Sequence, residues 1–257
     1  MGKMKLHFMG TNGWFATETG NTTSALLETP DRYIVLDAGD GIQHLDELAT
    51  DRKKPVDIFL SHFHIDHISG LHLLPKFRKI PKISIFGQTG TARVLSFFVA
   101  HPFTAPFSEL KGLGINVSAH DLELGMNDMG SYNVECAPLL HADLAWGFRF
   151  SFPDGKIISY CTDTGPCENL VKLSSGADAM ITECSMPPGT KTDNKWPHLT
   201  PEGAAKAAKE AVCKKLYLTH FAADFYNTLA DRKKAEAAAR KIFPNTVAAK
   251  DGLTFEI

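Results

Sequence analysis

Residues 62–67 read His-Phe-His-Ile-Asp-His, and this run constrains the fold more than any other part of the chain. It directly follows an apolar stretch with the length and residue types of a buried strand. In an extended segment, His62 and His64 point to the same side because side chains alternate with period two. Asp66 and His67 then fall in a tight turn, where their donor atoms can converge on a second point. This density of imidazoles and carboxylate predicts a metal site with room for two ions.

The composition is that of an ordinary globular protein, with 44% hydrophobic and 22% charged residues. A net charge of -2 argues against a protein held on nucleic acid by its global charge. The five cysteines form no C-x-x-C pair, which predicts reduced thiols and a cytoplasmic location. The chain begins with a strand-like stretch, and no segment reaches the roughly 18 apolar residues of a membrane span. We therefore expect a cytoplasmic protein with no membrane partner.

Short strands alternate with helical segments along the whole chain, which predicts one α/β domain over residues 1–257. The clearest helix begins after Thr200, which can cap it, and Pro201 suits its first position. Two strands end in Asp-x-Gly turns, at Asp37 and at Asp163, which suggests two similar halves. The predicted strands are 5–9, 24–28, 33–36, 56–60, 82–86, 133–137, 146–152, 156–161, 177–182 and 215–219, and the predicted helices are 42–50, 70–77, 90–99, 201–212 and 231–242.

The six-residue run supplies only part of two coordination shells, so other ligands must come from elsewhere. His141, Asp163 and His220 lie at predicted strand ends or adjacent turns, where polar side chains gather at a sheet edge. Each ion then keeps room for a shared water, as a catalytic site requires. The prediction assigns the first ion to His62, His64 and His141, the second to Asp66, His67 and His220, with Asp163 bridging the two.

Other polar residues have structural interpretations. Asp37 ends a strand from which it can accept the second N–H of a metal-bound imidazole, or it can stabilise its own turn. The charged stretch 232–234 is predicted to be solvated. The basic cluster at positions 76, 78, 79 and 82 is also expected to be a solvated face, with binding of a polyanion as the less favoured alternative. The histidines not expected to bind metal are His7, His44, His72, His101 and His120.

The run 62–67, followed in order by His141, Asp163 and His220, resembles the metallo-β-lactamase superfamily of hydrolases. The resemblance implies a four-layer αβ/βα sandwich, the metallo-β-lactamase fold. It also implies two divalent metal ions, with zinc expected and manganese or iron also compatible with the ligands.

Within that superfamily the chain resembles the phosphodiesterase branch that includes ribonuclease Z. The similar elements are residues 6–13, 182–185 and 198–200. A leaving alkoxide needs a proton, and we expect His198 to donate it while Glu183 orients His198; both residues match the family elements. Glu183 could instead be a surface carboxylate at a strand end. Asp66 is expected to orient the attacking water.

The chain also departs from ribonuclease Z. It has no long Gly/Pro-rich arm of the kind used to grip tRNA, and its insert over residues 101–114 is short, aromatic and apolar. This insert could be a lid, a dimer contact or a packed surface loop. The difference favours a substrate smaller than tRNA.

The expected function is therefore a dinuclear phosphodiesterase that acts on nucleotides or a small phosphodiester through a metal-bridging hydroxide. One alternative is hydrolysis of a sulfate ester or lactone on the same metal site. Another is a non-hydrolytic binding or redox module, although the chain offers no flavin partner domain. Nucleic acid is a compatible but less favoured partner, and a homodimer would suit the family. The sequence does not determine the substrate, the physiological metal or the oligomeric state.

Overall fold

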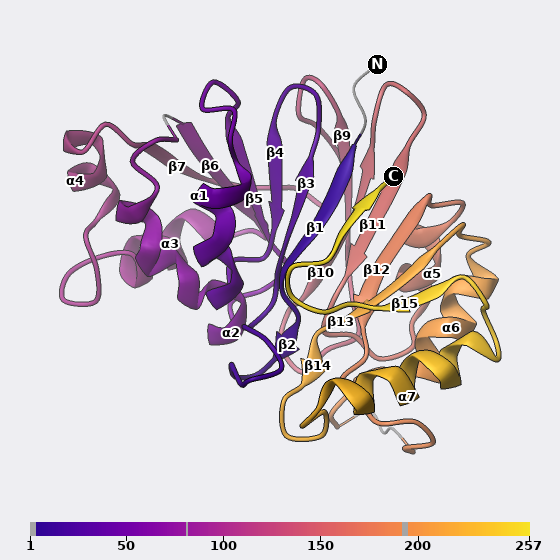
Figure 1. The fold of residues 1–257 in the computed structure, drawn as a ribbon. Coiled ribbons are helices and arrows are strands. Elements are labelled where there is room, and N and C mark those ends of the chain that lie inside the picture. Colours follow the sequence, from indigo (N-terminus) through magenta and orange to yellow (C-terminus); the bar gives the residue numbers. More distant parts are fainter. Residues whose placement is uncertain (1–3, 81, 192–194) are drawn as a thin grey trace. The chain divides into compact units, whose positions relative to one another are not determined.

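A computed structural model describes residues 4–80, 82–191 and 195–257 of the protein. The chain divides into two compact units that alternate along the sequence. Unit 1 comprises Met1–Gly10, Asn21–Leu122 and Asp251–Ile257, and unit 2 comprises Thr11–Gly20 and Glu123–Lys250. Each unit has a mixed sheet with helices (Figure 1), so the predicted α/β class is confirmed. The assignment of all residues to one domain stays a prediction.

The sheet of unit 1 is built from antiparallel strands on one side and parallel strands on the other. The parallel part begins at β4, and each following strand is reached by a crossover that includes helical segments. Among the described residues its strands lie in the order β16 (Thr254–Glu256), β1 (Lys5–Gly10), β3 (Ser24–Glu28), β4 (Tyr33–Leu36), β5 (Val56–Leu60), β6 (Lys82–Gly87) and β7 (Asn116–Asp121).

The sheet of unit 2 has the same plan, with its parallel part beginning at β11. In the part of the chain that the structure describes, its strands lie in the order β15 (Thr246–Ala248), β13 (Leu216–Thr219), β12 (Ala179–Glu183), β11 (Ile157–Cys161), β10 (Trp146–Ser151), β9 (Asn133–Pro138) and β8 (Gly125–Asp128). A small parallel pair joins β14 (Phe221–Ala222) to β2 (Asn12–Gly13).

In both sheets, candidate site residues lie at the ends of corresponding parallel strands. β4 and β11 are each the first parallel strand of their sheet, and they are followed by Asp37 and Asp163 respectively. The next parallel strand of each sheet leads to the histidine run in unit 1 and ends at Glu183 in unit 2. The similarity suggested by the two Asp-x-Gly turns is therefore present in the strand order of the two sheets.

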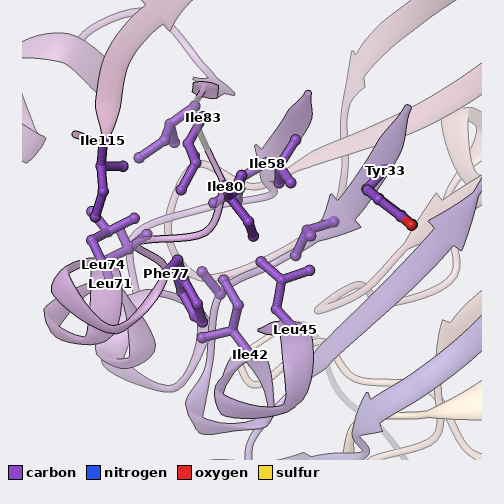
Figure 2. Packing of buried hydrophobic residues seen from close by; sticks show 14 of the residues in the cluster. Tyr33, Ile42, Leu45, Ile58, Leu71, Leu74, Phe77, Ile80, Ile83 and Ile115 are labelled. Carbon is purple, nitrogen blue, oxygen red and sulfur yellow. The ribbon is translucent and has the colours of Figure 1, made fainter. Parts of the chain in front are cut away.

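The core of unit 1 lies between one face of its sheet and its helical segments. Ile58 and Ile83 come from β5 and β6, whereas Leu45, Leu74 and Phe77 come from helical segments and the turn after them, and all five are buried. Figure 2 shows these side chains gathered in one cluster. Removal of this apolar surface from water stabilises the unit by about 1.5–3 kcal/mol for each fully buried side chain.

Each of the five predicted helices contains helical residues, whereas the helical segments over residues 65–68, 107–112 and 168–174 were not predicted. Thr200 caps α6, since its side chain accepts a hydrogen bond from the Gly203 N–H. The helix predicted over residues 42–50 is wrong in part, because a 3-10 turn occupies residues 40–44 before one turn of α-helix. The segments are η1 (Asp40–His44), α1 (Leu45–Leu48), α2 (Ile65–Ile68), η2 (Ser69–Lys76), α3 (Thr91–Phe98), α4 (Phe107–Gly112), α5 (Glu168–Ser174), α6 (Pro201–Glu210) and α7 (Leu229–Arg240).

The insert over residues 101–114 belongs to unit 1 and contains helix α4. Phe107 packs against the core of the unit and Leu110 is buried, whereas Phe103 is 76% exposed. One side of the insert is therefore ordinary packed structure. Its predicted role as a lid or dimer contact stays untested. No helix within the described ranges is both long and apolar enough to span a membrane.

Candidate metal centre

The histidine run begins one residue after β5, and the helical turn α2 carries its second half. The rings of His62 and His64 have centroids 4.5 Å apart, and those of His62 and His67 are 4.1 Å apart. The Asp66 carboxylate lies 3.6 Å from Nε2 of His67. The predicted tight turn is thus one turn of helix, and the four polar side chains of the run gather at the end of the strand.

Asp37 is fully buried beside this run and anchors it through its carboxylate. Oδ2 accepts a hydrogen bond from Nδ1 of His67 at 2.7 Å and another from the Ser61 hydroxyl at 2.8 Å. Oδ1 accepts from the Ser61 backbone N–H at 2.7 Å. The carboxylate therefore fixes the ring of one candidate ligand directly.

The same contacts determine which nitrogen of each ring carries hydrogen. A carboxylate can only accept, so Nδ1 of His67 carries the hydrogen and Nε2 has a lone pair for a cation. Ser61 Oγ gives its hydrogen to Asp37 and lies 3.0 Å from Nδ1 of His62, from which it accepts. His62 therefore also presents Nε2 as a Lewis base. One carboxylate thus prepares two imidazoles for metal binding.

The loop that carries Asp37 packs directly on α2. The Ala38 N–H donates to the His67 carbonyl at 2.8 Å. A Cβ at Gly39 would lie 2.2 Å from the Asp66 carbonyl oxygen, so only glycine fits there. This close approach explains the Asp-Ala-Gly sequence at residues 37–39.

In unit 2, Asp163 lies between two candidate histidine ligands. Its Oδ1 is 3.0 Å from Nε2 of His220, and its Oδ2 is 3.9 Å from Nε2 of His141. Each carboxylate oxygen thus faces a different imidazole, and the three side chains are nearly inaccessible.

Ser185 sets the orientation of His220 in the way that Ser61 does for His62. Its Oγ lies 3.0 Å from the carbonyl oxygen of His220, to which it donates, and 3.1 Å from Nδ1 of the same residue. Nδ1 of His220 therefore carries the hydrogen, and Nε2 faces Asp163 as a Lewis base.

Glu183 is fully buried and contacts His198, as expected, so it is not a surface carboxylate. Its Oε1 accepts a hydrogen bond from Nδ1 of His198 at 2.8 Å. The carboxylate also accepts three backbone hydrogen bonds, which come from the N–H groups of Thr164, Leu199 and Ser185. The His198 ring centroid is 5.4 Å from that of His141. A rigidly oriented imidazole thus lies beside a candidate ligand of the same unit.

Three of these polar residues have a left-handed backbone conformation, with φ of 57° at Asp37, 53° at Asp163 and 50° at His220. Non-glycine residues seldom adopt it, and it costs about 1 kcal/mol or more for each. Aspartate tolerates it better than most residues because its short side chain bonds locally. Such strain at three candidate site residues suggests that the fold is arranged around their side chains.

The histidines predicted to be structural have local contacts. His7 bonds Thr254 and lies 3.5 Å from Glu28, and burial lowers its pKa below the ordinary value. His72 is exposed and contacts the backbone of Ser69. The remaining three contact side chains close in sequence, namely those of Glu47, Glu109 and Ser118.

The prediction for the stretch 232–234 is wrong at Arg232, which is 2% exposed.

Ser61 and Ser185 contact candidate ligands but were not predicted to belong to the site. Ser61 precedes the histidine run and Ser185 lies two positions after Glu183, so each follows its strand at the sheet edge. The sequence could have indicated these serines only through their closeness to candidate site residues. Serine is too common at strand ends for that indication to be specific.

All seven predicted ligands are described residues with side chains able to hold a metal ion. Four belong to unit 1 and three to unit 2. Imidazole nitrogens and carboxylate oxygens suit zinc, manganese and iron, and three of the rings have Nδ1 engaged as a donor, which leaves Nε2 for the ion. The donor set therefore fits divalent metal.

Comparison with known proteins supports this chemistry. A model of the family described as "Beta-lactamase superfamily domain" matches residues 32–221. Ribonuclease Z of Bacillus licheniformis is 28% identical over 306 aligned positions, which cover 99% of this chain and 99% of the relative. Ribonuclease Z of Microcystis aeruginosa is 29% identical, with 99% of this chain and 96% of the relative covered.

Solved structures share the fold. The metallo-beta-lactamase fold protein YhfI from Bacillus subtilis superposes with a TM-score of 0.79 at 19% identity, over 98% of this chain and 99% of that one. The short form of human tRNase Z gives a TM-score of 0.72 at 21% identity, over 98% of both chains. The predicted metallo-β-lactamase fold and the resemblance to the ribonuclease Z branch are confirmed. The chain therefore belongs to the beta-lactamase superfamily and is a metal-dependent hydrolase similar to the ribonuclease Z branch of that family.

Proposed function

We propose that the protein is a phosphodiesterase that acts on a nucleotide or another small phosphodiester with two divalent ions bound. The observation that carries this proposal is the Glu183–His198 pair beside His141. An alkoxide that leaves phosphorus needs a proton, and an imidazole next to a metal ligand is placed to supply it.

The proposed ligand set divides the seven residues between two ions. The two oxygens of Asp163 face His141 and His220, which supports its role as the bridging ligand. When bound, two such ions lower the pKa of a water molecule and neutralise the oxygens of a phosphodiester. The first ion is assigned to His62, His64 and His141, the second to Asp66, His67 and His220, and Asp163 to both.

His198 is proposed to protonate the leaving oxygen through Nε2, since Nδ1 is engaged by Glu183. The donor form is the imidazolium, and the buried Glu183 carboxylate stabilises its positive charge. Because Glu183 is itself held by three backbone N–H groups, it cannot turn away from the ring. The pair works as a histidine and carboxylate do in a hydrolytic triad, with the carboxylate fixing tautomer and orientation.

Asp66 is proposed to orient the attacking water by accepting a hydrogen bond from it. Asp66 is the second residue of α2 and is half-buried, so its backbone is fixed by the helical turn while its carboxylate remains accessible. Its neighbour His67 is anchored to Asp37, which limits the movement of the helical turn.

The proposed substrate is smaller than tRNA. The alignment with the Bacillus licheniformis relative spans 306 positions, whereas this chain has 257 residues, so at least 49 of those positions have no counterpart here. The missing Gly/Pro-rich arm agrees with this difference. Without that arm, the site itself must supply most of the substrate contacts.

The direct test uses protein stripped of metal and reloaded with zinc or manganese. We expect metal to restore hydrolysis of bis-p-nitrophenyl phosphate and to leave p-nitrophenyl sulfate nearly unreactive. Activity on the sulfate alone would overturn the phosphodiesterase proposal and favour the other ester. A ligand variant, His62→Ala, serves as the control, because contaminating hydrolase would survive this substitution.

The proton-donor role has its own test in substrates with good and poor leaving groups. His198→Ala should reduce turnover of a dinucleotide roughly 100- to 10,000-fold. It should affect bis-p-nitrophenyl phosphate much less, because p-nitrophenolate leaves without a proton. Equal losses on both substrates would refute the donor role and leave His198 with a binding or structural one.

A further inference from the structure

The segment Thr11–Gly20 of unit 2 carries two exposed aromatic side chains that the proposed mechanism does not use. Trp14 is 67% exposed and Phe15 is 42% exposed. Their ring centroids are 5.2 Å apart in an edge-on arrangement. Apolar surface that stays in contact with water is unfavourable relative to buried surface, and exposed apolar patches commonly mark binding sites.

This segment lies against His220, a proposed metal ligand of the same unit. A Cβ at Gly13 would lie 2.5 Å from Cε1 of the His220 ring, so the backbone of Gly13 packs on the imidazole. The strand pair β2–β14 joins the same two regions, with Asn12 opposite Phe221. Trp14 therefore follows the residue that touches the metal ligand.

The turn that presents Trp14 is strained. The Phe15 N–H donates to the Gly13 carbonyl at 3.0 Å, and φ of Trp14 is 73°. These are the features of a γ-turn with positive φ at its central residue, a rare conformation that costs free energy. A bulky aromatic residue is an unusual occupant, which suggests that the position of its ring matters.

Arg232, which is buried in unit 2, stabilises the residues that flank the strained turn. Its guanidinium donates to the side chains of Thr11, Asn12 and Thr19. Its Cζ also lies 4.7 Å from the centroid of the Phe221 ring. The Asn12 amide in turn donates to the Phe15 carbonyl at 3.2 Å. The turn is therefore fixed before any ligand arrives, as a binding surface with low ordering cost should be.

We propose that Trp14, with Phe15 at its edge, is a stacking platform for a nucleobase of the substrate. This inference rests on the proposed function, since the platform adjoins a proposed metal ligand and would hold the nucleoside side of a phosphodiester. A rigid indole face binds any base by stacking, which gives a preference for nucleotides without selecting one base. Trp14 is thereby a specificity-determining residue, and Arg232 is the residue that positions it.

The test compares two esters with the same leaving group, thymidine 5′-p-nitrophenyl phosphate and methyl p-nitrophenyl phosphate. Wild-type protein should show the larger kcat/KM on the thymidine ester. In Trp14→Ala the ratio of the two kcat/KM values should fall roughly 5- to 100-fold, mainly through KM of the thymidine ester. Trp14→Phe should restore most of the ratio. The matched control is Phe97→Ala, which removes a 68% exposed ring from α3 of unit 1 and should leave the ratio unchanged.

The outcomes separate the two proposals. If wild-type protein hydrolyses neither ester, the proposed phosphodiesterase function fails. If it hydrolyses both and Trp14→Ala keeps the wild-type ratio, the stacking proposal alone is refuted.

Fluorescence gives a second readout that does not depend on turnover. Thymidine 5′-monophosphate should quench wild-type tryptophan emission, and Trp14→Phe should lose most of this quenching. Trp196→Phe removes another exposed indole, 64% accessible, and should retain the quenching. Full quenching in Trp14→Phe would contradict the proposal.

Discussion

Replacement of Asp37 by asparagine tests how the protein prepares its histidines for metal. Asparagine has the same shape and tolerates the left-handed conformation of residue 37, so the backbone should be kept. Its carbonyl oxygen can still accept from the Ser61 N–H, as Oδ1 does in the wild type. The amide NH2 would then replace Oδ2, which accepts from Ser61 Oγ and from Nδ1 of His67.

After the substitution, the amide NH2 of residue 37 faces the Ser61 hydroxyl and the His67 Nδ1–H, so hydrogen-bond donors face donors. His67 relieves this clash by moving its hydrogen to Nε2, the nitrogen that should bind metal, and His62 loses the chain of bonds through Ser61. Loss of such an outer hydrogen bond typically lowers metal affinity 10- to 100-fold. Because one carboxylate supports two rings, we expect an effect near the upper end, about 100-fold, which corresponds to about 2.7 kcal/mol.

The assay is competition for zinc between the protein and a chromophoric chelator, with thermal unfolding of the metal-free protein as a check on folding. Asp57→Asn is the matched control. Asp57 is a buried aspartate of β5 whose carboxylate pairs with Arg32, so its replacement should lower stability without changing zinc affinity. Wild-type zinc affinity in Asp37→Asn would refute the argument that Asp37 sets the tautomers of the two histidines.

Three further predictions concern the rest of the molecule. Burial raises the pKa of Cys136 and Cys213 to about 12, so iodoacetamide at pH 8 should label them only after denaturation, and rapid labelling of native protein would contradict their burial. Arg232→Met should lower the free energy of unfolding by about 2–4 kcal/mol in urea melts, since it leaves buried acceptors unsatisfied and removes the contact with Phe221; a change under 1 kcal/mol would show that the guanidinium contributes little. Burial opposes ionisation of Asp178, but its bonds from Lys214 and from the Ile157 N–H lower its pKa below 3.8, so its contribution to stability is present above pH 3.8 and is lost as pH falls further. Asp178→Asn should accordingly cost a few tenths of a kcal/mol at pH 7 and less as the pH falls below 3.8, and a cost that does not change with pH would exclude the ionic contribution.

The sequence predicts the central strands well and the sheet margins poorly. β3, β4 and β5 have the predicted bounds, because continuous apolar runs between turn residues are characteristic of buried strands. β7 was not predicted, since it is an edge strand with polar residues on both faces and little burial. The three-residue strands β15 and β16 are too short to show a period.

The candidate site was predictable where its residues are rare and close in sequence. The run 62–67 is recognisable as a metal site because three histidines and one aspartate fall within six positions. The Glu183–His198 contact agrees with the family elements that suggested it. Arg232 was misassigned because its partners Thr11, Asn12 and Thr19 lie more than 200 positions away, and a charged residue on a helix is usually solvated. Trp14 gave no signal in the sequence, because its significance comes from its exposure and its backbone conformation.

The most direct test of the central claim is a metal titration of stripped protein, with bound zinc counted by mass spectrometry and hydrolysis of bis-p-nitrophenyl phosphate followed in the same samples. The proposed ligand set predicts that two ions bind for each chain and that activity rises until both are present. Diester hydrolysis by metal-free protein would contradict the account, and so would a fully loaded protein with two ions and no diesterase activity.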